Sequence, residues 1–254
     1  MRSQQRRPTC KPSFGSDTLS RTVNLRELQR QLRDRASAKQ AKALQRFFKT
    51  GPGEYGEGDV FLGLRVPEVR RLARSSDALS LAEVRTLLRS KYHEERLLAL
   101  VILVRRFERG DAATRRRLFD LYLRSTRSIN NWDLVDSSAP HIVGGWLLDN
   151  PRTVLDELAA AGVVWQRRIA VLATLAFIRQ GQFDDTVRLC RRLLDDPHDL
   201  MHKACGWMLR EVGQRNAAVL QDFLDHHAAR MPRTMLRYAI EHLPEQQRKQ
   251  YLAR

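Results

Sequence analysis

The apolar residues of this chain recur almost everywhere at helical spacing, and alternation with a period of two is almost absent. From about Val23 onward, runs such as Leu97, Leu98, Val101 and Ile102 place apolar side chains on one face of a helix. Residues that start or stop helices recur roughly every 15 to 20 positions. The pattern therefore predicts an all-α protein of about twelve short helices.

Two details illustrate the pattern. At Asp196-Pro197, the Asp can cap a helix, the Pro fits its first turn and Asp199 can complete a capping box. This predicts a helix that begins there and runs to Gly213. The longest nearly apolar stretch, residues 169–178, suits a buried helix and is too short to cross a membrane.

Pairing consecutive helices gives units of about 35 to 45 residues, the length of HEAT or armadillo repeats, although no crisp sequence repeat is visible. Such pairs stack into a curved solenoid with a concave face that can cradle a duplex. We expect one such domain over residues 22–254. Residues 1–21, which contain Arg2, Arg6, Arg7 and Lys11, are predicted to form a disordered basic tail.

The charge of the chain favours a polyanionic partner. Its 38 Arg and 7 Lys against 29 Asp and Glu give a formal net charge of +16 over 254 residues. Arginine also offers a planar fork for phosphate groups, so nucleic acid is the leading partner class. Codon bias is the simplest alternative explanation, and an acidic protein partner stays open.

The three cysteines, Cys10, Cys190 and Cys205, are widely spaced and form no CxxC pair. They support neither a disulfide framework nor a zinc ribbon, and a reducing cytoplasm fits them best.

Two motifs look functional but have weak support. Gly51, Gly53 and Gly56 form a literal GxGxxG, yet they follow a helical stretch and contain Pro52, so residues 49–63 are better interpreted as a long loop. His198 and His202 have the spacing of a zinc-protease motif, but the acid between them is Asp199, which already suits the helix start. We expect no metal there.

The segment NNWDLVD at residues 130–136 is the most informative in the chain. Trp132 and Asp136 are spaced i and i+4, so they share one face of a helix. An aromatic wall beside a carboxylate attracts cations, which is unusual in a protein with surplus positive charge. The alternative is a core Trp132 with Asp136 in an ion pair with a neighbouring arginine.

Six segments stand out along the chain: FLGLRVP at 61–67, HEER at 93–96, NWDLVD at 131–136, RRIA at 167–170, KACGWMLRE at 203–211 and MPRTMLRYA at 231–239. In this order, along residues 21–254, they resemble the AlkD-type DNA alkylation repair glycosylases, a family of HEAT-like repeat DNA glycosylases.

The resemblance implies a right-handed α-solenoid of about six HEAT-like antiparallel helix pairs with a concave basic groove. It further implies binding of duplex DNA and excision of cationic alkylated purines, such as N3-methyladenine and N7-methylguanine, without drawing the base into a deep pocket. No cofactor or metal is implied. We expect a monomer at the nucleoid in the cytoplasm, without membrane attachment.

The resemblance also implies roles for individual residues. The family's catalytic aspartate corresponds to Asp136 and its two groove tryptophans to Trp132 and Trp207. A DNA-contacting arginine corresponds to Arg168, although the adjacent Arg167 leaves open which of the two faces the groove. Further candidates for phosphate contacts are Arg210, Arg233 and Arg237.

An N-alkylated purine already carries a positive charge, so it needs no general acid to leave. The group that needs stabilisation is the sugar cation, and Asp136 as an anion can supply it. No lysine is evident in this cluster for Schiff-base chemistry, which predicts a monofunctional enzyme. Two other functions stay open: a non-catalytic HEAT-like scaffold for damaged or branched DNA, and a solenoid that binds an acidic protein.

Overall fold

Helices supply the regular structure of the chain. The computed structural model describes residues 24–254, so the basic tail predicted over residues 1–21 lies outside the described residues. Within the described range there is no strand, and a single bridge joins Val60 to Tyr92. The helices are α1 (Leu25–Asp34), α2 (Ala38–Phe47), α3 (Val66–Arg74), α4 (Leu81–Leu88), α5 (His93–Arg109), α6 (Ala112–Arg124), α7 (Trp132–Asp136), α8 (Gly145–Leu147), α9 (Val154–Ala159), α10 (Val164–Ala173), α11 (Leu175–Ile178), α12 (Asp184–Arg192), α13 (Asp199–Arg215), α14 (Ala217–His227), α15 (Arg233–Ala239) and α16 (Glu245–Leu252).

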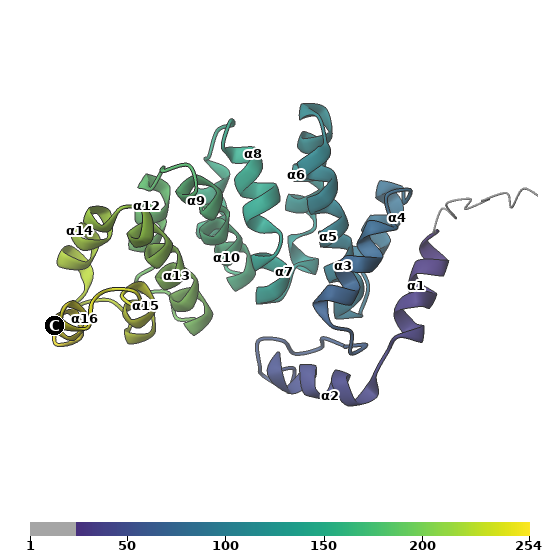
Figure 1. Cartoon of the computed structure of the whole chain (residues 1–254), viewed down its shortest axis with the longest axis horizontal. Helices are drawn as coiled ribbons and strands as arrows, with labels where there is room; N and C mark the ends of the chain where they lie inside the picture. Colours follow the sequence, from purple (N-terminus) through teal and green to yellow (C-terminus); the bar gives the residue numbers. More distant parts are fainter. Residues whose placement is uncertain (1–23) are drawn as a thin grey trace, which may run out of the picture.

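The helices form an arch of two rows (Figure 1). One row contains α4, α6, α8, α9, α12 and α14, and the other contains α3, α5, α7, α10, α13 and α15. Consecutive helices pack across the rows in the pairs α4–α5, α9–α10 and α12–α13. The architecture is therefore an α-solenoid, as predicted.

The apolar stretch at residues 169–178 is buried throughout, as predicted. It forms the second half of α10 and all of α11, which are separated only at Thr174, whose hydroxyl donates to the carbonyl of Val171 at 2.7 Å. Similarly, a π-helical turn over Pro140–Gly144 leads directly into α8. Such interruptions explain why the described residues contain sixteen α-helices where the sequence pattern predicts about twelve helices.

The predicted start of the helix at Asp196 is wrong by a few residues. The helix begins at Asp199, and the Nδ1 atom of His198 accepts from the amide of Leu200 as its cap. The Asp196 carboxylate is occupied elsewhere, because it accepts hydrogen bonds from the Arg167 guanidinium and from the His198 amide. The helix also continues through Gly213 to Arg215.

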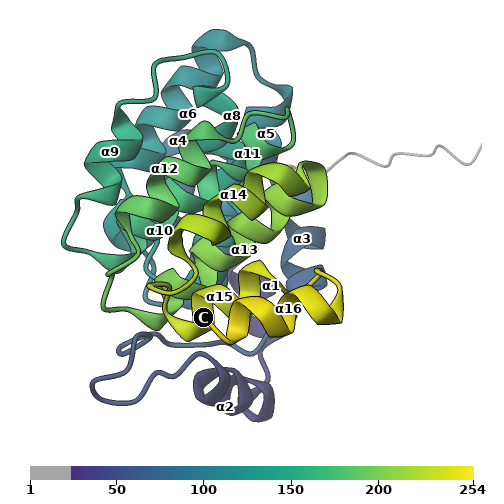
Figure 2. The ribbon, with the colours of Figure 1, turned by 90° about the vertical axis from the view of Figure 1, so that its left-hand side faces the viewer.

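The loop predicted over residues 49–63 connects α2 to α3, and both segments cross the open side of the arch (Figures 1 and 2). The Glu94 carboxylate holds the end of the loop, because it accepts from the amides of Leu62, Gly63 and Leu64 at 2.7–3.2 Å. Gly63 has a φ of +90°, and a Cβ there would lie 2.3 Å from the carbonyl oxygen of Ser37. This anchoring fixes the loop against the first turn of α5.

No helix within residues 24–254 is both long and apolar enough to span a membrane. The thiols of Cys190 and Cys205 are buried and free, whereas Cys10 lies outside the described residues.

Candidate functional site

A cleft of about 620 Å³ opens between the α2–α3 loop (residues 49–63) and the row of helices that contains α7, α10, α13 and α15. It brings Trp132, Asp136, Arg168 and Trp207 together, four of the residues expected at the site. Its other lining residues are Phe47, Lys49, Tyr55, His198, Asp199, Leu200, Lys203 and Tyr238. The cleft is therefore built from segments that span almost the whole described chain.

Helix α7 is short, and its start fixes the direction of Trp132. The Asn131 side-chain oxygen accepts from the Trp132 amide at 2.8 Å, and the Asn131 side chain is fully buried. One helical turn later, Asp136 faces the same cleft. The prediction that Trp132 and Asp136 share a helix face is therefore confirmed.

Asp136 forms a bidentate ion pair with Arg168. The Arg168 Nε atom donates to Oδ1 at 2.8 Å and Nη2 donates to Oδ2 at 2.7 Å, while Nη1 donates to the carbonyl of Leu200. The Asp136 side chain is 17% exposed and Arg168 is 4% exposed. Burial raises the pKa of the Asp136 carboxyl above its ordinary value, and the Arg168 charge opposes that rise.

This ion pair is the alternative that the sequence left open for Asp136. It does not remove the carboxylate from the cleft, because both Asp136 and Arg168 line it. Each carboxylate oxygen also has a second lone pair, so a bound group can still approach it. Arg168 is the partner of this carboxylate, and its contact with DNA stays a prediction.

Aromatic rings border the carboxylate on two sides. Trp132 stacks on Phe48 with ring centroids 5.1 Å apart and meets the exposed Phe47 edge-on at 5.9 Å. On the other side, the Trp207 indole donates to Glu211 at 3.1 Å, and Tyr238 lines the same part of the cleft. The walls thus offer ring faces and edges that suit a flat or cationic group.

The close approach of α13 and α15 depends on Gly206. A Cβ at this position would lie 2.5 Å from the Met235 carbonyl oxygen and 2.5 Å from the Tyr238 Cβ. Glycine therefore lets Trp207 and Tyr238 line one wall together.

The structure separates Arg167 from Arg168. Arg167 pairs with Asp196 at 2.6 Å and also donates to the carbonyls of Ala161 and Gly162, and it does not line the cleft. Consecutive helical residues point about 100° apart, so only one of the two can face the cleft.

The remaining predicted DNA contacts differ in their availability. Arg210 is in an ion pair with Glu241. Arg233 and Arg237 of α15 are exposed, and neither forms an ion pair with another described residue. The role of all these arginines in DNA binding stays a prediction.

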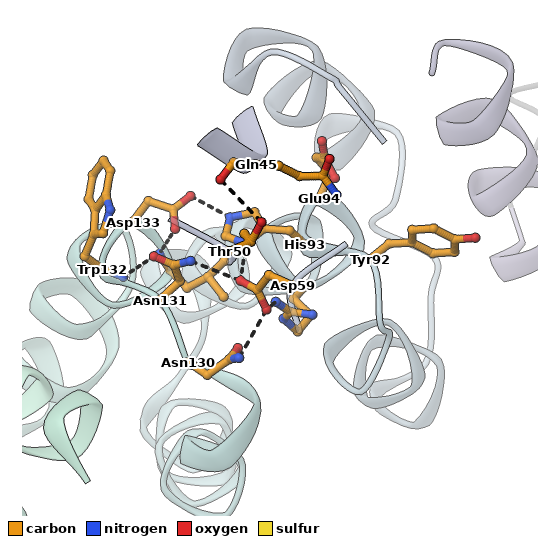
Figure 3. Close-up of polar contacts among 12 residues, drawn as sticks. Gln45, Thr50, Asp59, Tyr92, His93, Glu94, Asn130, Asn131, Trp132 and Asp133 are labelled. Atoms are coloured by element: carbon orange, nitrogen blue, oxygen red, sulfur yellow. Dashed lines mark hydrogen bonds and ion pairs between the residues drawn. The ribbon is translucent and has the colours of Figure 1, made fainter. Parts of the chain in front are cut away.

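A buried polar network behind the cleft was missed by sequence reasoning (Figure 3). At its centre, His93 is 2% exposed and lies between two carboxylates, with Nε2 2.8 Å from Asp133 and Nδ1 3.2 Å from Asp59. Asp59 also accepts from Arg96 at 2.6 Å and from Asn131 at 3.0 Å. We call these residues the His93 network. It joins the α2–α3 loop, the start of α5 and the start of α7.

The His93 network is charged. Burial by itself would lower the pKa of His93, but the hydrogen bonds to Asp133 and Asp59 outweigh it and raise the pKa to about 9. Burial would raise the pKa of Asp59, but His93 and Arg96 lower it to about 2. The sequence contains one indication of this network, the HEER segment, in which His93 and Arg96 share a helix face. Asp59 is 34 residues away, so no spacing connects it to them.

Comparisons with known proteins agree with this fold. No protein of curated function is significantly similar in sequence. A structure described as a predicted DNA alkylation repair enzyme from Enterococcus faecalis superposes with a TM-score of 0.66 at 16% identity, covering 83% of this chain and 97% of that one. The smu.31 structure from Streptococcus mutans UA159 gives a TM-score of 0.50 at 12% identity, covering 87% and 99%. At these identities the two structures support the fold alone.

The sequence pattern of one protein family, described as DNA alkylation repair enzyme, matches residues 28–243. This match includes every residue of the cleft and of the His93 network. The chain therefore belongs to the DNA alkylation repair enzyme family.

Proposed function

We propose that this protein is a DNA glycosylase that hydrolyses the N-glycosidic bond of cationic alkylated purines, such as N3-methyladenine and N7-methylguanine, in duplex DNA. The observation that carries the proposal is the Asp136 carboxylate in a cleft bordered by Trp132 and Trp207. A negative group between aromatic walls suits a cation, although the protein as a whole is strongly basic.

The reaction needs little acid catalysis. The C1′–N9 bond breaks and its electron pair leaves with the purine, which becomes neutral because it carried a positive charge. The deoxyribose is left as an oxocarbenium ion. Asp136 stabilises this cation electrostatically and orients the water that attacks C1′, and the water proton passes to the carboxylate or to solvent.

Arg168 supports this role in two ways. Two charge-assisted hydrogen bonds fix the orientation of the Asp136 carboxylate, and the guanidinium favours its ionised form. Trp132 and Trp207 would hold the deoxyribose or the base through face contacts, worth about 0.5–2 kcal/mol each. The lesion would be reached in the open cleft, without a deep pocket for a flipped base.

The cleft contains two lysines, Lys49 and Lys203, where the sequence predicts none. Lys203 pairs with Asp199 at 2.8 Å, and this hydrogen bond raises the pKa of Lys203. A protonated amine is a poor nucleophile, so the enzyme is proposed to be monofunctional. Borohydride should therefore trap no covalent complex with abasic DNA, and trapping would argue for a lyase.

The direct test of the proposal is incubation of the protein with methylated duplex DNA, followed by chromatography of the released bases. Free 7-methylguanine or 3-methyladenine, together with an equal number of abasic sites, is the expected result. A protein that binds DNA but releases no base would contradict it.

One observation favours a second function. Because Asp136 is already paired with Arg168, the pair also suits a scaffold that binds damaged or branched DNA without chemistry. That function predicts tight binding to junctions and no released base in the same experiment.

A further inference from the structure

A second hollow, of about 380 Å³, lies where α4 and α6 end. Four arginines line it together with Leu121, Ser125 and Ser128, and we call it the arginine hollow: Arg85, Arg89, Arg124 and Arg127. Arg85 and Arg89 come from the end of α4, Arg124 from the last turn of α6 and Arg127 from the 3₁₀ turn Thr126–Ser128. All four side chains are exposed.

These four arginines have no counter-ion in the described part of the chain. No carboxylate in residues 24–254 forms an ion pair with any of them, whereas Arg152, Arg167, Arg168 and Arg188 are all paired. The carbonyl ends of α4 and α6 favour nearby cations, which is consistent with arginines at these positions, but they are not counter-charges for four side chains. Four like charges around one hollow therefore attract an anion from solution.

The arginine hollow lies close to the cleft along the chain. Arg127 precedes Trp132 by five residues, so their Cα atoms are at most about 18 Å apart. The Gln166 side chain also donates to the Thr126 hydroxyl at 3.0 Å, which ties this turn to the helix that carries Arg168. A duplex rises about 3.4 Å per base pair along its axis, so the Cα atoms of Arg127 and Trp132 are separated by no more than the length of about five base pairs.

We propose that the arginine hollow binds backbone phosphates of the duplex beside the lesion. The proposal rests on the proposed function for the identity of the partner and adds the surface that holds it. Guanidinium groups fit phosphate oxygens bidentately and read no base sequence, so these contacts would position the duplex. Arg167, Arg168 and Arg210 already have carboxylate partners, whereas the arginines of the hollow have none within residues 24–254.

The test compares the double variant Arg124→Gln/Arg127→Gln with the matched control Arg179→Gln/Arg191→Gln. The control arginines are also exposed and form no ion pair in the described part of the chain, and Arg179 lies at the far end of the α10–α11 rod from Arg168. Both variants remove two positive charges. Any difference between them therefore comes from position rather than net charge.

Binding to an undamaged labelled duplex is measured by fluorescence anisotropy between about 50 and 200 mM salt. Each lost phosphate contact lowers the slope of log K against log salt by about 0.9, so the hollow variant should lose about two units of slope. The control should change the slope by less than about half a unit. Equal slopes for the two variants would overturn the proposal.

Two further measurements distinguish a failure of this proposal from a failure of the proposed function. If the wild type releases no base but the two variants still differ in salt slope, the proposed glycosylase function is wrong and the hollow is still supported as a DNA-binding site. Inorganic phosphate could instead raise the melting temperature of the wild type but not that of the hollow variant. If the DNA salt slope of the hollow variant is then unchanged, the hollow binds small anions and the proposal is overturned.

Discussion

The Asp136 carboxylate and the Arg168 guanidinium face each other through two hydrogen bonds of 2.8 and 2.7 Å. Arg168 also donates to the Leu200 carbonyl, so the pair connects α7, α10 and the first turn of α13. The candidate catalytic group is therefore held in one orientation by a buried partner. A change in this pair should therefore alter the stability of the fold, the pKa of Asp136 and the proposed catalysis together.

Asp136→Asn should destabilise the protein because it leaves the Arg168 charge buried without a counter-charge. We expect the free energy of unfolding to fall by about 3–5 kcal/mol in urea denaturation. Asp136→Asn/Arg168→Gln should regain part of this loss, because the second change removes the isolated charge. Equal stability of Asp136→Asn and the wild type would contradict the buried ion pair.

The pH dependence of base release should have an acidic limb set by Asp136. Burial raises the pKa of this carboxyl, so activity should fall with decreasing pH before the ordinary aspartate range near 3.9 is reached. In Arg168→Gln the opposing charge is absent, and the limb should shift to higher pH. Single-turnover rates, corrected for spontaneous depurination, measure the acidic limb in the wild type and in Arg168→Gln. Identical limbs in the two proteins would exclude an effect of Arg168 on the titration of Asp136.

The His93 network should make stability depend on pH on the alkaline side. The pKa of His93 is about 9 in the fold and ordinarily 6.5, so its contribution is fully present below about pH 6.5 and is lost as pH rises through 9. A shift of this size corresponds to about 3 kcal/mol. Urea denaturation at pH 6 and near pH 9.5 measures the loss, which should be absent in His93→Gln. A wild type and a His93→Gln variant with the same pH dependence would disprove it.

Gly206→Ala should push α15 away from α13, since the new methyl group meets the Met235 carbonyl and the Tyr238 Cβ at 2.5 Å. We expect a loss of about 1–3 kcal/mol in unfolding free energy, typical of overpacking. Gly162→Ala is the control, because a Cβ there has no neighbour within 4 Å. If both variants unfold at the same denaturant concentration, the close contact does not limit the packing.

Much of the fold could be predicted from the sequence because its signals are local. Helical spacing predicts the all-α class, and i, i+4 spacing predicts that Trp132 and Asp136 share a face. The buried stretch at residues 169–178 follows from its apolar composition. The sequence predicts the start of α13 too early because the Asp196 carboxylate binds Arg167 of α10, which no local pattern reveals.

The site could be predicted only in part because its partners are distant in sequence. Arg168 pairs with Asp136 from 32 residues away, and His93 pairs with Asp133 from 40 residues away. The position of Arg168 came from a family resemblance, but its pairing depends on how α7 and α10 pack. The lysines of the cleft and the arginine hollow likewise arise from segments that only the solenoid brings together.

The most direct measurement is the single-turnover release of 7-methylguanine from methylated duplex DNA by the wild type and by Asp136→Asn. Both proteins are used at saturating concentration and at a temperature where circular dichroism shows the variant folded. We predict release by the wild type and a rate at least about 10²-fold lower for the variant, with DNA binding retained. Equal rates, or no release by the wild type, would contradict the assignment of Asp136 as the group that stabilises the sugar cation.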